Sequence, residues 1–252
     1  MKKITITTFL LISLSFSTIH STCAKRCFPF GISTISKIRK SSWISRLRGG
    51  DSNNDIKKDA TATNIVSKNM YNNQANNWVR TEPTCLSDFT GRPVVFNLIA
   101  KEIASLEKKN NECSDSGDRD ILVCDIGCGE GYCARKVVEL GASKVIGIDI
   151  SEEMINCAKE VSKGDDRFRY VSGSGSSLIQ ILTDQSDYFG IKDVREGIAD
   201  IAIAVFLFNY LTTIEMKDVI SQIFNTVKSG GAFIFSVPHP SMIYCHDKDA
   251  IF

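Results

Sequence analysis

From residue 121 onward, the sequence alternates between short apolar runs and segments long enough to form a helix. The run at 121–126 is continuous, as expected for a strand buried on both faces of a sheet. Further runs lie at 145–149, 168–172, 198–206 and 232–237, and helix-period apolar residues lie between them. Strands separated by helices form a parallel sheet covered on both faces. The predicted fold class is therefore α/β, with a doubly wound, mostly parallel sheet.

A glycine-rich loop follows the first run, at the end of a strand where ligands bind in sheets of this kind. It reads Asp125-Ile-Gly127-Cys-Gly129-Glu-Gly131. Glycines let the backbone turn sharply and let a ligand approach it. Asp149 ends the second run, 18 residues after Gly131, where a carboxylate can accept both hydroxyls of a ribose. The loop and this acid together predict a site for a nucleoside-bearing cofactor.

Two acids, Asp125 and Glu130, flank the start of the helix that follows the loop. A pyrophosphate binds at such a helix start through bare N–H groups and the helix dipole. Like charges about 4 Å apart repel by roughly 4 kcal/mol at an effective dielectric of about 20. The third glycine also comes one position earlier than in the dinucleotide pattern G-x-G-x-x-G. We therefore expect a cofactor with positive charge and no phosphate, and S-adenosylmethionine has this chemistry.

The motifs at 123–131, 145–151 and 227–233 closely resemble those of class I S-adenosylmethionine-dependent methyltransferases. The resemblance covers roughly residues 90–240 and implies a Rossmann-like sheet and a methyltransferase activity. It assigns the methionine end of the cofactor to Asp125 and the loop glycines, and the ribose to Asp149. The remaining predicted cofactor contacts are Cys128, Ile150, Ser174 and Phe206.

One position departs from the family pattern. Many relatives place an aspartate after the third strand to bind the adenine amino group, whereas this chain has Ser172-Gly-Ser-Gly175. We expect Ser174 to accept this hydrogen bond more weakly, since neutral hydrogen bonds are about half as strong as charge-assisted ones. Affinity for the cofactor is therefore expected to be lower than in those relatives.

No residue stands out as a catalytic base. The weak candidate is His239, just past the fifth run, where a lone imidazole is more typical of a structural role. In-line transfer from a sulfonium depends mainly on positioning, so a dedicated base is not obligatory. No metal site is predicted, because Cys124, Cys128 and Cys133 lack the spacing of zinc ligands.

The expected reaction is methyl transfer to a small-molecule acceptor. Nucleic acid is disfavoured as a partner, because nine of the 30 basic residues lie in residues 1–50, which leaves 21 basic against 29 acidic residues, a balance of −8. The alternatives are a non-catalytic cofactor-binding or truncated protein and, less favoured, an NAD(P)-dependent oxidoreductase.

The N-terminal part has the composition of a targeting sequence. Residues 1–24 are typical of a signal peptide, and residues 25–50 form a basic, Ser-rich, acid-free segment typical of a transit peptide. The apolar stretch is shorter than the ~20 residues of a membrane span. A two-part presequence predicts import into a plastid, with secretion or mitochondrial import as alternatives. Residues 51–69 are interpreted as a linker and residues 70–252 as the methyltransferase domain.

The C-terminal part is short for this family. Only 15 residues follow Val237, too few for the two antiparallel strands that resembling proteins have after the fifth. We therefore expect strands 6 and 7 to be missing and the fifth strand to be an exposed apolar edge. A truncated chain is the preferred interpretation, and coverage of this edge by a partner or a second copy, as in a dimer, is the alternative.

Overall fold

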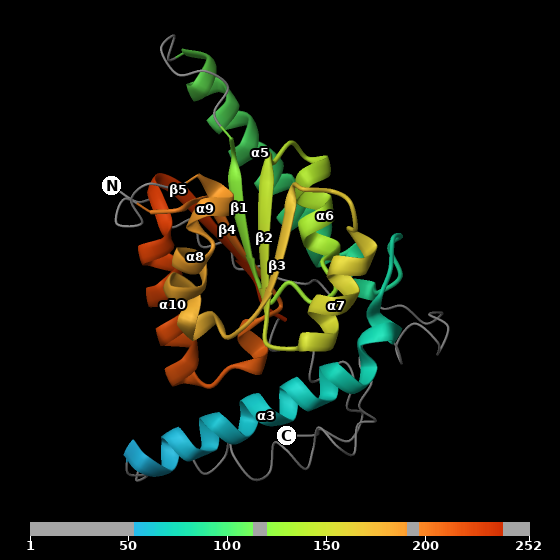
Figure 1. Ribbon diagram of the computed structural model, residues 1–252, viewed down its shortest axis with the longest axis vertical. Helices are drawn as coiled ribbons and strands as arrows, with labels where there is room; N and C mark the ends of the chain where they lie inside the picture. Colours follow the sequence, from blue (N-terminus) through green and yellow to red (C-terminus); the bar gives the residue numbers. More distant parts are fainter. Residues whose placement is uncertain (1–52, 113–119, 191–196, 239–252) are drawn as a thin grey trace, which may run out of the picture.

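The computed structural model describes residues 53–112, 120–190 and 197–238 (Figure 1). The presequence segments 1–24 and 25–50 and the candidate base His239 lie outside these ranges. The strands are β1 (Leu122–Ile126), β2 (Lys144–Asp149), β3 (Phe168–Ser172), β4 (Ala199–Val205) and β5 (Val227–Ser236). The helices are α3 (Asn53–Trp78), α4 (Leu86–Phe89), α5 (Gly91–Glu112), α6 (Tyr132–Glu139), α7 (Glu152–Val161), α8 (Leu178–Asp184), α9 (Ser186–Phe189) and α10 (Thr213–Thr226), with 3-10 turns η1 (Gly175–Ser177) and η3 (Phe208–Tyr210).

The five strands form one parallel sheet in the order β3-β2-β1-β4-β5. The chain reverses direction of winding at β1, whose neighbours are β2 and β4. This confirms the predicted doubly wound, Rossmann-like α/β fold, and it places the carboxyl ends of β1, β2 and β4 together at the switch point where such sheets bind ligands. The edge strands of the described sheet are β3 and β5. Strands 6 and 7, which we expect to be missing, would follow the fifth strand, and residues 239–252 lie outside the described ranges.

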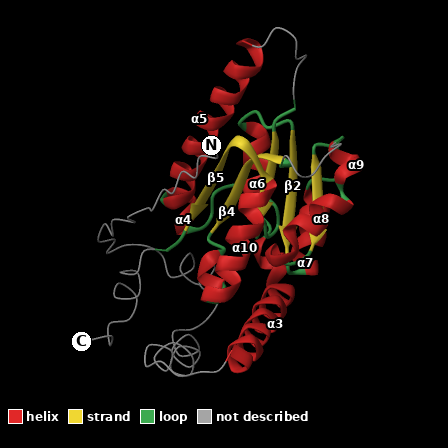
Figure 2. Ribbon diagram, turned by 90° about the vertical axis from the view of Figure 1, so that its left-hand side faces the viewer, coloured by secondary structure: helices red, strands yellow, loops and turns green. Residues whose placement is uncertain are grey.

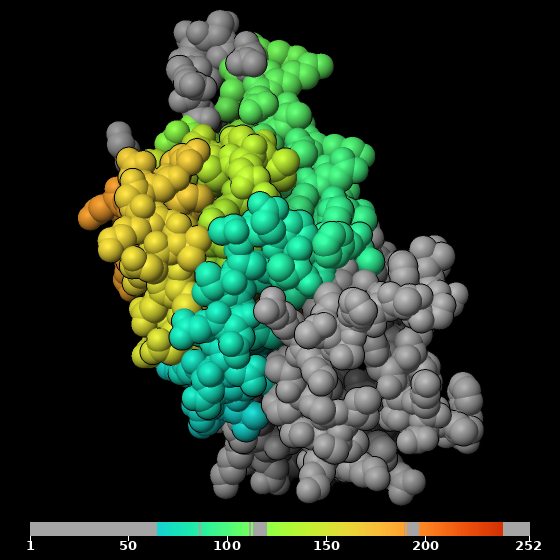
Figure 3. Space-filling model, turned by 90° about the vertical axis from the view of Figure 1, so that its right-hand side faces the viewer, coloured from blue at the N-terminus to red at the C-terminus, as the bar shows by residue number. Residues whose placement is uncertain are grey.

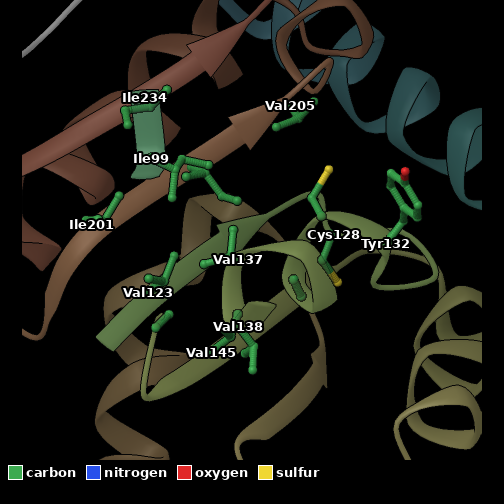
Figure 4. Packing of buried hydrophobic residues seen from close by; sticks show 14 of the residues in the cluster. Ile99, Val123, Cys128, Tyr132, Val137, Val138, Val145, Ile201, Val205 and Ile234 are labelled. Carbon is green, nitrogen blue, oxygen red and sulfur yellow. The ribbon is translucent and has the colours of Figure 1, made fainter. Parts of the chain in front are cut away.

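Each face of the sheet has its own hydrophobic core. One core joins α5, α6 and α7 to alternate strand residues such as Val123, Val145 and Ile201 (Figure 4). The other joins α8 and α10 to the opposite set, which includes Cys124 and Ile146. Figures 1 and 2 show these two helical layers on either side of the strands. Burial on both faces explains why β1 and β4 are apolar without alternation, whereas the edge strand β3 includes the exposed Arg169.

The segment interpreted as a linker, 51–69, is helical from Asn53 onward, as part of α3. Figure 1 shows α3 running across the end of the sheet where the strands finish. Its contacts with α7 are polar and recur every four residues: Lys68 binds Glu152, Asn72 binds Ser151, and Asn76 accepts a hydrogen bond from Cys157. One helical face carries this stripe. An interpretation based on apolar periodicity could not detect it, and the domain boundary at residue 70 stays a prediction.

The last helix and strand also differ from expectation. β5 begins at Val227, directly after α10, and not at Ala232. The pair Gly230-Gly231, which has the composition of a helix stop, lies within β5, where Gly230 has a positive φ of 83° and the pairing with β4 shifts register. The buried residues of α10 are Glu215, Val219, Ile223 and Thr226, while Ile220 is exposed.

The buried face of α7 consists of Met154, Ile155 and Ala158, whereas Cys157 is half-buried and Val161 is exposed. Ser151 caps this helix, since its hydroxyl accepts a hydrogen bond from the N–H of Met154. Among the described helices, none combines the length and the apolar character that crossing a membrane requires.

Candidate functional site

The glycine loop wraps over the carboxyl end of β2. The N–H groups of Gly127 and Cys128 both donate to the carbonyl of Ile148, at 2.7 and 3.1 Å. Gly127, Gly129 and Gly131 have φ values of 76°, 56° and 83°, in the left-handed region that favours glycine. The sequence therefore needs glycine at all three positions to make this turn.

The three glycines differ in the space around them. A Cβ at Gly131 would lie 2.6 Å from the Tyr170 hydroxyl, and one at Gly127 would lie 3.0 Å from a Leu207 methyl group. A Cβ at Gly129 would meet no atom within 4 Å. Gly127 and Gly131 thus allow close packing of the loop, whereas Gly129 presents bare backbone to open space, which is what a ligand approaching the loop requires.

Asp125, near the end of β1, is buried, with 1 % of its surface exposed. Its Oδ2 atom has no hydrogen-bond partner among the described residues. Burial, together with repulsion from Asp149, raises the pKa of Asp125 to about 7. A buried acceptor without a donor is costly, and it identifies the place where a cationic ligand group would be stabilised.

Asp149, at the end of β2, is held by the backbone. Its Oδ2 accepts a hydrogen bond from the N–H of Gly129 and its Oδ1 from the N–H of Ser151, both at 2.9 Å. Burial raises the pKa of Asp149, and these N–H groups oppose the rise. Asp149 therefore links the glycine loop to the start of α7. Each carboxylate oxygen has a second lone pair, so both can still accept a hydroxyl.

The structure also locates the other predicted contacts. Ile150 follows Asp149 and is half-buried. Ser174 lies just beyond β3, but its hydroxyl already accepts a hydrogen bond from the N–H of Ser176 as the cap of η1. The Cys128 side chain is buried against Gly147, where an added Cβ would lie 2.9 Å from Sγ. Only the backbone of Cys128 can then face a ligand at the loop.

Phe206, directly after β4, has a φ of 60°, the sole positive value for a residue other than glycine within the described ranges. A left-handed conformation costs such a residue roughly 1–2 kcal/mol. The Phe206 N–H donates to the carbonyl of Ser236, and its ring packs on Gly91. The guanidinium of Arg92 lies 5.3 Å from the ring centroid. Strain of this kind at the switch point is typical of a functional site.

The negative charge of Glu130, within the glycine loop, is paired with two arginines. Its Oε1 lies 3.0 Å from Nη1 of Arg80, and its Oε2 lies 2.6 Å from Nη2 of Arg135. The expected repulsion of a pyrophosphate by two acids is therefore wrong for Glu130, because two guanidinium groups neutralise it. The electrostatic case against a dinucleotide depends on Asp125, together with the glycine spacing.

The aromatic residues near the site have separate roles. Tyr132 is buried under the guanidinium of Arg80, 4.4 Å from the ring centroid, so its role is packing. Tyr71, from α3, meets Tyr210 edge to face at 5.6 Å and Trp78 at 6.1 Å. Burial and the Tyr210 hydroxyl raise the pKa of Tyr71 well above its usual value. Tyr71 therefore joins α3 to the segment after β4.

Sequence reasoning missed the residues that come to the loop from the N-terminal segment. Arg80, Asp88 and Arg92 were not predicted, and Arg80 reaches Glu130 across 50 positions of sequence. Tyr210, which follows β4, was not predicted either. Ion pairs between such distant residues have no spacing pattern that a single sequence reveals. The described residues contain no cluster of three or more side chains suited to a metal ion.

The donor set at the loop fits S-adenosylmethionine. Asp125 offers a buried acceptor without a donor, the chemistry that an α-ammonium group requires. Gly129 offers bare backbone beside it, and Asp149 offers carboxylate lone pairs for hydroxyl groups.

Comparison with known proteins also indicates similarity to methyltransferases. Residues 123–231 match the family model described as a methyltransferase domain. An uncharacterized protein of Haemophilus influenzae is 26% identical over 170 residues, which are 68% of this chain and 56% of that protein. A ribosomal protein L11 methyltransferase of Vibrio cholerae is 30% identical over 115 residues, 45% of this chain and 32% of that protein.

An S-adenosylmethionine-dependent methyltransferase structure from Listeria monocytogenes, itself described as putative, is 26% identical, with a TM-score of 0.38 and coverage of 56% of each chain. The chain spans about half the length, or less, of the curated relatives that it matches. The methyltransferase-domain model matches residues 123–231, the segment that carries the glycine loop and Asp149, and this similarity agrees with the resemblance to class I S-adenosylmethionine-dependent methyltransferases.

Proposed function

We propose that this chain transfers a methyl group from S-adenosylmethionine to a small-molecule acceptor. The observation that carries the proposal is the buried, unpartnered Oδ2 of Asp125 beside the open backbone of Gly129. The family match over residues 123–231 supports the same cofactor.

The residues of this chain would bind the cofactor and orient it. Asp125 would accept hydrogen bonds from the α-ammonium group, and the open space at Gly129 would leave room for the methionine end. Asp149 would accept from the ribose hydroxyls, while Ile150 and Ser174 would border the adenine. The cofactor supplies an activated methyl group when bound, so the protein has to supply position and a dry pocket.

The transfer region is proposed to lie between Phe206 and Tyr71. Phe206 approaches from the end of β4 in a strained conformation, and Tyr71 approaches from α3, which crosses the same end of the sheet (Figure 1). Their rings present apolar surface, which excludes water from a reacting nucleophile. Neither provides an ionised base, since the pKa of Tyr71 is raised well above 10.0.

A small acceptor is favoured over a nucleic acid by the balance of −8 in residues 51–252. Relatives named for ribosomal protein L11 and for the mRNA cap suggest macromolecular acceptors as the competing outcome. We further propose import into a plastid, on the basic, acid-free composition of residues 1–50. A fluorescent protein fused after residue 50 should enter the plastid, and its secretion or its arrival in mitochondria would refute the import proposal.

The test of the enzymatic proposal is release of S-adenosylhomocysteine. The full chain is incubated with S-adenosylmethionine and fractions of a metabolite extract below about 1 kDa, and separately with a protein and an RNA fraction. Turnover is expected with a small-molecule fraction. Turnover only with protein or RNA would refute the small acceptor, and binding without turnover in any fraction would support the non-catalytic alternative.

A further inference from the structure

Two buried carboxylates and three partly buried arginines form an alternating series next to the glycine loop, which we call the charge chain: Arg92, Asp88, Arg80, Glu130 and Arg135. Its contacts are Arg92 Nη1 to Asp88 Oδ1 at 2.8 Å, Arg80 Nε to Asp88 Oδ2 at 3.3 Å, Arg80 Nη1 to Glu130 Oε1 at 3.0 Å, and Arg135 Nη2 to Glu130 Oε2 at 2.6 Å. The side chains of Asp88 and Glu130 are 0 % and 4 % exposed. Because these carboxylates are removed from water, the electrostatic attraction in their ion pairs is stronger than in pairs at the surface.

The charge chain joins the N-terminal helices α4 and α5 to the glycine loop and α6. Arg92 and Asp88 belong to α5 and α4, and Asp88 also accepts hydrogen bonds from the N–H groups of Thr84 and Cys85. Glu130 and Arg135 belong to the glycine loop and α6. Arg80 lies between the two carboxylates, in the connection that leads from α3 to α4. Figure 3 shows this connection, in cyan, lying against the rest of the domain.

Backbone contacts make the junction specific for its residues. Arg135 donates to the carbonyls of both Glu130 and Arg80, at 2.7 and 2.8 Å. Arg80 donates in turn to the carbonyl of Trp78, the last residue of α3, at 3.2 Å, and it stacks on Tyr132. The two arginines therefore fix the main chain on both sides, which a single ammonium group could not do.

The position of Glu130 gives this junction a consequence for binding. Glu130 stands between Gly129 and Gly131, both in the left-handed region, in the backbone with the greatest conformational freedom of the site. A loop ordered before a ligand arrives does not lose that freedom on binding, so the affinity is higher.

We infer that Arg80 is a positioning residue for the glycine loop, and that through Glu130 it couples the order of the loop to the order of the segment connecting α3 and α4. Arg80 does not touch the ligand in this account; it acts through Glu130. The inference rests on the proposed binding of S-adenosylmethionine at the loop. It predicts that weakening the junction lowers affinity at the loop and loosens residues 79–88 at the same time.

The test compares Glu130→Gln and Arg80→Lys with the wild-type full chain. Gln has the size of Glu but presents an amide nitrogen to one arginine, and Lys keeps the charge but loses the fork. Glu160→Gln is the matched control, since it removes an exposed pair between Glu160, on α7, and Lys163. Calorimetry with S-adenosylhomocysteine measures affinity, and amide hydrogen exchange without ligand measures the order of residues 79–88 and 127–132.

We expect both variants to weaken binding about 10-fold, a change of about 1.4 kcal/mol, and to speed exchange about 10-fold or more in both segments. The control should match the wild type. A merely structural role would change thermal stability while leaving affinity within twofold, and this result, or faster exchange in one segment alone, would overturn the inference. If the wild type itself does not bind S-adenosylhomocysteine, the proposed function fails, whereas the exchange arm still decides whether the junction orders the loop.

Discussion

The two sides of the candidate site are held in different ways. On the sheet side, glycines shape the loop, and backbone N–H groups hold the carboxylate of Asp149. These contacts join residues at strand ends. On the N-terminal side, side-chain ion pairs and hydrogen bonds hold α3, the connection and α5. The difference teaches that the sheet side depends on local backbone geometry, whereas the N-terminal side depends on charges from distant positions. Substitutions should therefore have different signatures on the two sides.

The largest expected effect on the sheet side is that of Asp125→Asn. Loss of a charge-assisted hydrogen bond should lower affinity for S-adenosylhomocysteine about 10- to 100-fold. Thermal stability at pH 7.5 should rise, because the raised pKa means that ionising Asp125 in the folded state costs free energy at any pH above its ordinary pKa of 3.8. Scanning calorimetry and a binding titration measure both quantities. A variant that is less stable and binds equally well would contradict this role of Asp125.

The next largest effect is expected for Asp149→Asn, and its sign distinguishes Asp149 from Asp125. Asp149→Asn places an amide N–H against the N–H of Gly129 or Ser151, so one backbone donor loses its acceptor. The free energy of unfolding should fall by about 1–3 kcal/mol, opposite in sign to the change for Asp125→Asn. Urea titration of the two variants side by side measures this. Equal signs for the two variants would remove the distinction between Asp125, whose Oδ2 atom has no donor among the described residues, and Asp149, whose two oxygens are both held by the backbone.

Substitutions of the two glycines beside Glu130 should also have different effects. Gly131→Ala brings a Cβ within 2.6 Å of the Tyr170 hydroxyl, and it should cost about 2–4 kcal/mol of stability from strain and overpacking. Gly129→Ala meets open space, so it should cost only about 1 kcal/mol for its positive φ while lowering affinity about 10-fold. Denaturation and binding titrations of both variants test whether the space at Gly129 is used by the ligand.

The smallest effect is expected on the polar face of α3. Lys68→Ala removes a half-exposed pair with Glu152 and should change stability by less than about 0.5 kcal/mol. Asn72→Ala removes the partner of the Ser151 hydroxyl and should cost about 1 kcal/mol. Urea titration of both variants provides the measurement. A larger loss for Lys68→Ala than for Asn72→Ala would show that the surface charge, and not the hydrogen bond to the helix cap, anchors α3.

The same contrast explains what the sequence predicted. Strands β1, β2 and β4 were placed to within one residue, because a strand buried on both faces is a continuous apolar run between turns. The glycine loop and Asp149 were found because φ angles and strand ends impose residue types at fixed spacing. The helix α3 was missed because its contacts are polar, and β5 was started late because a glycine pair inside a strand has the composition of a helix stop. Arg80 was missed because its partners come from distant positions.

The central claim is that Asp125, a buried acid whose Oδ2 atom has no donor among the described residues, accepts the α-ammonium group of a sulfur nucleoside at a site that does not accept a diphosphate. The most direct measurement is calorimetric titration of the full chain with S-adenosylhomocysteine and with NADH, at pH 6 and pH 8. The account predicts low micromolar binding of S-adenosylhomocysteine, tighter at pH 8 because Asp125, with a pKa of about 7, is then ionised, and no binding of NADH. Binding of NADH without S-adenosylhomocysteine would contradict it.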